Sequence, residues 1–100
     1  MDKQVTKMMS SIPIDLGKVG KDSIDREVLR TAIIAELDAI SLYEQLAAMT
    51  QNKDLKAVFL DVAKEEKTHA GEFQALLLKL DPEQEKELSA GRKEVEELTE

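Results

Sequence analysis

Hydrophobic residues recur at steps of three and four along two long stretches of the chain, a spacing typical of amphipathic helices. The stripe on the first stretch consists of Leu29, Ile33, Glu36, Ile40, Tyr43 and Ala47. The stripe on the second consists of Leu55, Val58, Val62, Glu66, His69, Phe73, Leu76 and Leu80. These patterns predict helices over about 24–49 and 53–80. Asp22 or Ser23 is suited to cap the first helix, and Asn52 the second.

The break between the two helices is the short polar segment at 50–52, which favours an antiparallel hairpin. A further helix start follows: Asp81 is suited as its cap, Pro82 as the proline of its first position and Gln84 as the capping-box partner. They predict a third, shorter helix over about 82–98. The fold class is therefore all-α, with a helical domain over 23–100.

Residues 1–22 show no sustained hydrophobic period and contain Pro13, Gly17 and Gly20. We interpret them as an extended N-terminal arm that docks on a neighbouring molecule. A mobile tail is the alternative that this composition leaves open.

Ionisable residues interrupt both hydrophobic stripes, and unpaired buried carboxylates are costly. Glu36 precedes Gln51 by the same number of positions as Glu66 follows it, so the hairpin should place the two carboxylates at one level. His69 follows Glu66 by three residues on the same face. The three side chains are therefore predicted metal ligands. A buried hydrogen-bonded Glu66–His69 pair, or an exposed groove, is the alternative.

A carboxylate-bridged di-iron bundle takes one Glu from each of two helices and a Glu-x-x-His pair from each of the other two. This chain has one helix of each kind and one histidine, so a second copy must complete the site and the four-helix bundle. Carboxylate and imidazole ligands suit iron, and manganese, zinc or calcium can substitute.

Net charge and composition narrow the classes of partner. The chain has 21 acidic and 14 basic residues, a net charge of −7, which argues against nucleic acid or an anionic membrane. It contains no cysteine, so thiolate sites are excluded. No apolar run reaches the roughly 18 residues of a bilayer span, and no signal peptide is evident. We expect a cytoplasmic protein.

Several other residues near the stripes have two interpretations. Tyr43 either relays electrons or packs as an ordinary core tyrosine. Glu65 and Glu72 are either outer-shell or metal-guiding residues, or solvated surface residues. Asp38 either lines an acidic access path or lies on a solvated face, and Asp61 is expected on a solvated face.

The segments at 35–44 (AELDAISLYE) and 65–69 (EEKTH), together with the LDPEQ step at 80–84, resemble the encapsulated ferritins. The likeness covers roughly residues 26–98 and is closest to archaeal-type members, some of which are fused to an encapsulin shell protein. In this resemblance Glu36, Glu66 and His69 match the metal ligands, Tyr43 a tyrosine near the site, and Asp38 an acidic position on the access path.

The resemblance implies a ferroxidase that oxidises Fe(II) with dioxygen at a dimer interface. It also implies an annular decamer and iron storage inside an encapsulin nanocompartment. The chain departs from some members at Ala35, where they have an acidic residue, and at Leu42, where they have a Trp. Members packaged as separate cargo often carry a Gly-rich tail with a targeting motif, whereas this sequence ends at Leu98, Thr99 and Glu100. We expect a truncated chain, a fragment of a shell fusion or an unpackaged member. The alternatives are a rubrerythrin-like peroxidase and a non-catalytic helical assembly module.

Overall fold

The chain forms three helices in the residues that the structure, a computed structural model, describes: Gly17, Gly20 and 23–100. They are α2 (Ile24–Met49), α3 (Lys53–Leu80) and α4 (Pro82–Thr99). The first two have the predicted bounds, and α4 extends one residue further than predicted. The all-α class is confirmed, whereas the predicted arm lies almost wholly outside the described residues.

The helix ends follow the capping chemistry at two of the three starts. Oδ1 of Asn52 accepts hydrogen bonds from the backbone N–H groups of Asp54 at 2.9 Å and Leu55 at 3.1 Å, so the predicted cap of α3 is confirmed. At α2 the N-cap residue is Ser23, but its side chain caps no backbone group. Its Oγ accepts from the guanidinium of Arg26 at 2.7 Å, which takes the oxygen away from the helix end.

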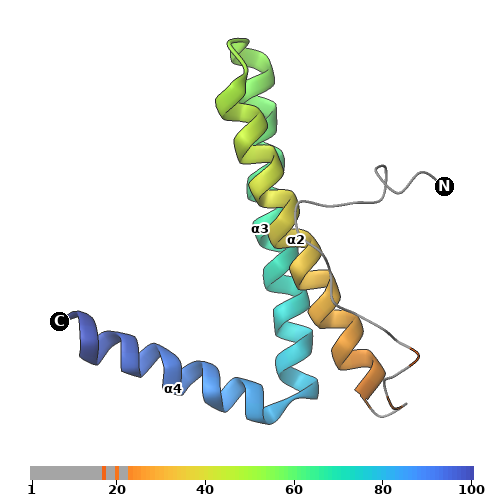
Figure 1. Ribbon diagram of the computed structural model, residues 1–100, viewed down its shortest axis with the longest axis vertical. Helices are drawn as coiled ribbons and strands as arrows, with labels where there is room; N and C mark the ends of the chain where they lie inside the picture. The colour runs from red at the N-terminus through yellow and green to blue at the C-terminus, as the bar shows by residue number, and fades with distance from the viewer. Residues whose placement is uncertain (1–16, 18–19, 21–22) are drawn as a thin grey trace.

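Helices α2 and α3 lie side by side and antiparallel as a hairpin, as Figure 1 shows. Among the described residues, the buried hydrophobic side chains are Ala47, Ala63 and Leu77. Two of these three are alanines, whose small side chains allow two helices to approach closely. Such a core is thin, and large hydrophobic residues remain exposed on the hairpin. Those on α3 are Leu55, Val58, Leu60, Leu76 and Leu80.

The corner between α3 and α4 is built on Asp81. Its backbone N–H donates to the carbonyl of Leu77, which ends α3, and its Oδ1 accepts from the N–H of Gln84 at 3.1 Å, which begins α4. Pro82 occupies the first helical position. The cap and the proline are confirmed. The predicted return hydrogen bond of the capping box, from the Asp81 N–H to the Gln84 side chain, is not formed, because that N–H donates to the Leu77 carbonyl instead.

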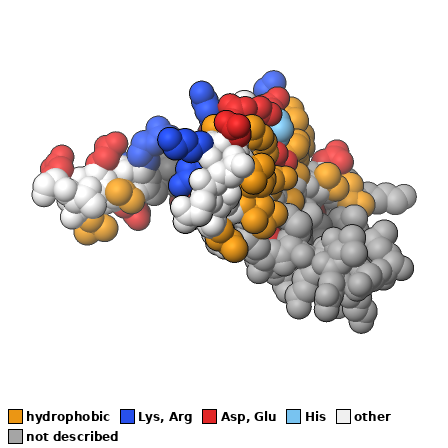
Figure 2. Space-filling view, turned by 90° about the horizontal axis from the view of Figure 1, so that it is seen from above, with side chains coloured by type: hydrophobic (Ala, Val, Ile, Leu, Met, Phe, Trp, Pro, Cys, Tyr) orange, Lys and Arg blue, Asp and Glu red, His pale blue; other side chains and the backbone are white. Residues whose placement is uncertain are grey.

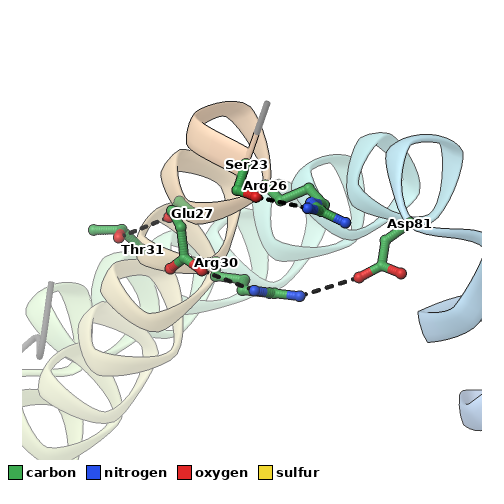
Figure 3. A network of polar contacts seen from close by, with 6 residues as sticks. All are labelled: Ser23, Arg26, Glu27, Arg30, Thr31 and Asp81. Atoms are coloured by element: carbon green, nitrogen blue, oxygen red, sulfur yellow. Dashed lines mark hydrogen bonds and ion pairs between the residues drawn. The ribbon is translucent and has the colours of Figure 1, made fainter. Parts of the chain in front are cut away.

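Arg30 ties this corner to the first turns of α2 (Figure 3). Its guanidinium donates to Oε1 of Glu27 at 2.9 Å and to Oδ2 of Asp81 at 3.1 Å. Beyond the corner α4 turns away from the hairpin, and none of its residues is buried (Figure 1). Arg30 is thus a direct side-chain tie between the hairpin and the residue at which α4 begins.

None of the helices over 23–100 is long and apolar enough to cross a membrane.

Candidate metal centre

Three side chains from the two hairpin helices converge near the middle of the hairpin. Glu36 comes from α2, and Glu66 and His69 lie one turn apart on α3. Nδ1 of His69 lies 3.5 Å from Oε2 of Glu66 and 3.8 Å from Oε2 of Glu36. One ligand atom from each residue lies within 4.8 Å of the others. The equal offsets from the loop therefore bring together the residues that the register predicts.

The two carboxylates of this cluster are held largely away from water. The Glu36 and Glu66 side chains are each 19% exposed, whereas the His69 side chain is 45% exposed. Oε2 of Glu36 is buried and accepts no hydrogen bond. A buried carboxylate oxygen without a partner is energetically costly, and a bound cation is one way to remove that cost.

The donor set fits a divalent transition metal. Carboxylate oxygens and an imidazole nitrogen are ligands that iron, manganese and zinc accept. The cluster supplies three protein groups, so a metal held there would keep further coordination positions open for other ligands. The cluster also lies beside the exposed stripe of α3. In Figure 2 the histidine side chain lies at the surface next to hydrophobic and acidic groups.

Tyr43 lies on the same stripe of α2 but packs toward the loop end of the hairpin. It is partly buried, and its ring stacks against Phe59 of α3, with centroids 6.3 Å apart and an interplanar angle of 23°. The register that aligned the metal cluster also explains this pair, because both rings lie equally far along the chain from Gln51. The packing agrees with a core tyrosine, and a role in electron relay stays a prediction.

The acidic residues around the cluster differ in exposure. Asp38 is 8% exposed and has an interaction partner, so the expectation that it lies on a solvated face is wrong. Its place on an acidic access path stays a prediction. Glu65, Glu72 and Asp61 are exposed, as expected of surface residues. A role of Glu65 or Glu72 in guiding metal stays a prediction.

Two ion pairs that link the helices were not anticipated from the sequence. Lys67 Nζ lies 3.2 Å from Glu44 Oε2 across the hairpin, and Arg30 reaches Asp81 at its open end. Neither pair joins residues at equal offsets from Gln51: Glu44 and Lys67 lie 7 and 16 positions from it, and Arg30 and Asp81 lie 21 and 30. The register that aligned the metal cluster therefore gave no signal for these two ion pairs.

Comparisons with known proteins agree with this fold. The profile of the family described as Rubrerythrin matches residues 27–100. The crystal structure of the encapsulated ferritin domain from Pyrococcus furiosus superposes with a TM-score of 0.78 at 52% sequence identity, and the match covers 91% of this chain and 93% of that one.

Two curated relatives also match. A ferritin-like-encapsulin shell fusion protein of Pyrococcus furiosus is 62% identical over 73 residues. An encapsulin nanocompartment cargo protein of Myxococcus xanthus, EncC, is 48% identical over 56 residues. The matches cover 73% and 56% of this chain, but only 21% and 43% of the respective relatives. The chain therefore corresponds to a part of each of these longer proteins.

Proposed function

The chain belongs to the rubrerythrin family of ferritin-like proteins, and from this premise we propose that it is a ferroxidase of the encapsulated-ferritin type. Its substrate is Fe(II), its electron acceptor is dioxygen, and its site is shared between two copies of the chain. The observation that carries the proposal is the convergence of Glu36, Glu66 and His69 around a carboxylate oxygen that has no hydrogen-bond partner.

The cluster is suited to hold iron through a change of charge. Each Fe(II) ion bound as substrate loses one electron to dioxygen. Glu36 and Glu66 supply two negative charges, which attract Fe(III) more strongly than Fe(II) and so favour the oxidised state. A carboxylate can bind through one oxygen or two and can bridge, so these ligands can follow the metal charge, while His69 fixes one side of the site.

A second copy is needed because one hairpin supplies only half of a di-iron ligand set. A carboxylate-bridged site takes two single Glu ligands and two Glu-x-x-His pairs, and this chain has one of each. A two-fold axis near the cluster would supply Glu36, Glu66 and His69 twice. The exposed hydrophobic side chains on α3 beside the cluster support such pairing, because they need to be covered.

The test is iron binding and oxidation in matched variants. Under nitrogen, native mass spectrometry should find two Fe(II) ions for each dimer of the wild type. After air is admitted, Fe(III) formation should be fast in the wild type. The rate of Fe(III) formation should fall by at least about tenfold in Glu36→Gln and His69→Gln. Replacing even a residue that only hydrogen-bonds to a metal ligand typically lowers activity by about that factor. Glu87→Gln, which changes an exposed carboxylate on α4, is the matched control.

Other outcomes identify the competing functions. If hydrogen peroxide oxidises the bound iron much faster than dioxygen does, a rubrerythrin-like peroxidase is the better description. If no iron binds and the variants behave like the wild type, the polar residues serve a non-catalytic assembly module.

We also propose that the chain assembles beyond the dimer, as an annular decamer that works inside an encapsulin nanocompartment. The names of both relatives refer to encapsulin, which supports this placement. Mass measured in solution tests the ring, and co-purification with an encapsulin shell protein expressed in the same cells tests the compartment.

A further inference from the structure

The side of α2 that points away from α3 carries a column of residues at helical spacing. This outer column consists of Glu27, Thr31, Ile34, Asp38, Ser41 and Gln45. Asp38 follows Glu36 by two positions, which is about 200° around the helix. Glu36 faces α3, so the outer column lies on the opposite side of α2 from both α3 and the metal cluster.

Burial along the outer column changes abruptly at one point. Thr31 and Ile34 are partly buried, and Asp38 is 8% exposed. Ser41 and Gln45, the next members of the column, are exposed. A hairpin of two helices alone would leave the outside of α2 exposed along its whole length. Some other part of the protein therefore covers the column as far as Asp38 and ends there.

The other described helices do not supply this cover. Helix α3 packs on the opposite side of α2, and α4 turns away from the hairpin (Figure 1). Asp38 has an interaction partner, but that partner is not among the side-chain hydrogen bonds and ion pairs formed within 23–100. The cover must then come from outside 23–100.

A turn just before α2 lets the preceding chain run back along the helix. The N–H of Ser23 donates to the carbonyl of Gly20 at 3.0 Å, which closes a four-residue turn at the start of α2. Asp38 lies about 22 Å from Ser23 along the helix axis, because each helical residue adds about 1.5 Å. About seven residues of extended chain span that distance.

One short part of the N-terminal arm has the pattern of an extended chain with one apolar side. Ile12, Ile14 and Leu16 alternate with a proline and an aspartate. Alternate side chains of an extended chain point to the same side, so these three can face one surface together. The proline also favours an extended conformation for the residue before it. About seven residues before Gly20, this part of the arm is at the right distance to reach Asp38.

We propose that residues 10–16 pack in extended form on the outer column of α2, so that the chain's own N-terminal segment covers it. The three apolar side chains of the segment lie against Ile34, and a hydrogen-bond donor of the segment satisfies the Asp38 carboxylate. Helix α2 then has a packing partner on two sides. That is expected of a helix whose central part carries apolar residues on every face, as 32–40 does here.

Thiol reactivity tests this packing directly, because the natural chain has no cysteine. Ile34→Cys places a thiol under the proposed segment, and Gln45→Cys places one at the exposed end of the same column. In the full chain a maleimide should modify position 34 much more slowly than position 45, each relative to the same chain unfolded in urea. The triple change Ile12→Ser/Ile14→Ser/Leu16→Ser should speed modification at 34 by about threefold or more and leave 45 unchanged.

A second triple variant is the matched control for the serine changes. Val5→Ser/Met8→Ser/Met9→Ser removes the same number of apolar side chains from the part of the arm that precedes the proposed segment. It should leave the rate at position 34 unchanged. Circular dichroism establishes that every variant keeps its helix content.

A mixing experiment distinguishes the chain's own segment from that of a neighbouring copy. The chain with Ile34→Cys and the serines at 12, 14 and 16 is mixed with an excess of the wild type, and the subunits are allowed to exchange. Packing within one chain predicts that modification at position 34 stays fast. A return to slow modification would show that the column receives a neighbour's segment, and it would overturn the proposal.

Two further results would overturn it. One is equal modification of positions 34 and 45 in the full chain. The other is a rate at position 34 that the serines at 12, 14 and 16 do not raise above that of the control triple variant. None of these measurements involves iron, so their outcome is separate from that of the ferroxidase test.

Discussion

The guanidinium of Arg30 donates to Oδ2 of Asp81 at 3.1 Å, and it joins the second turn of α2 to the residue that both ends α3 and caps α4. The Asp81 side chain is 12% exposed and the Arg30 side chain 43% exposed. Solvent therefore screens the pair from one side, and its free-energy contribution should be below about 1 kcal/mol. Its structural consequence is larger, because within residues 23–100 few other contacts hold α4 in its direction.

Variants at Asp81 should separate this ion pair from the helix cap. Asp81→Asn keeps a good capping side chain and removes the charge, so it should match Arg30→Gln and lower the free energy of unfolding by less than about 1 kcal/mol. Asp81→Ala removes both functions and should cost about 1 kcal/mol more. Urea denaturation followed by circular dichroism measures the series. Glu27→Gln, which removes the other partner of Arg30, is the control, and equal losses in Asp81→Asn and Asp81→Ala would contradict the separation.

Replacing Glu36 should abolish metal binding and raise the stability of the metal-free protein. Glu36→Leu removes a buried carboxylate oxygen that has no partner, so the metal-free protein should gain about 1 kcal/mol in its free energy of unfolding. The wild type should instead gain about 2.7 kcal/mol from a divalent metal at 100 times its dissociation constant, and the variant should gain nothing. Denaturation in EDTA and with added metal measures both changes in the free energy of unfolding. Glu87→Leu, measured in parallel, is the control. A variant that is less stable than the wild type in EDTA would show that the carboxylate is satisfied without metal.

Tyr43 should act mainly through its ring. Tyr43→Phe keeps the stacking on Phe59, so we expect stability and the initial rate of iron oxidation to stay within about twofold of the wild type. Tyr43→Ala removes the ring from a partly buried position and should cost roughly 2 kcal/mol. Stopped-flow oxidation and thermal denaturation measure the two effects. A large loss of oxidation rate in Tyr43→Phe, at unchanged stability, would assign the hydroxyl a role in electron transfer.

The cap of α3 gives a simple local prediction. Oδ1 of Asn52 satisfies two N–H groups that the helix leaves without partners, so Asn52→Ala should lower stability by about 1 kcal/mol. Asn52→Gly should lower it by only a few tenths of a kcal/mol. If the two variants lose equal stability, the loop sequence rather than the cap would set the stability of this end of the hairpin.

The hairpin and the cluster were predictable because both follow from periodicity and register. A stripe at steps of three and four fixes which residues share a face, and a short loop fixes which residues of two helices lie at one level. Glu36 and Glu66 follow from those two facts alone. The same rule applied to aromatic residues would also have paired Tyr43 with Phe59.

The sequence pattern failed where contacts depend on details outside the helix period. Asp38 has the helical phase of a surface residue, yet it is buried, and burial away from the hairpin stripe leaves no periodic signal. Ser23 has the composition of a cap, but the nearby guanidinium of Arg26 competes for its oxygen. In both cases the outcome depends on a contact that helical spacing does not predict: whether Asp38 is exposed or buried, and whether Ser23 caps the helix or binds Arg26.

The exposure of α4 affects how fast the protein is degraded. The 18-residue helix α4 has no buried residue, so it gains little from packing on the described residues, and such packing supplies most of the stability of helices in proteins. Its amides should exchange with solvent orders of magnitude faster than those of the hairpin, and a protease should cut there first. An assembly that covers α4 should slow both exchange and cleavage, so chains outside such an assembly should be degraded first.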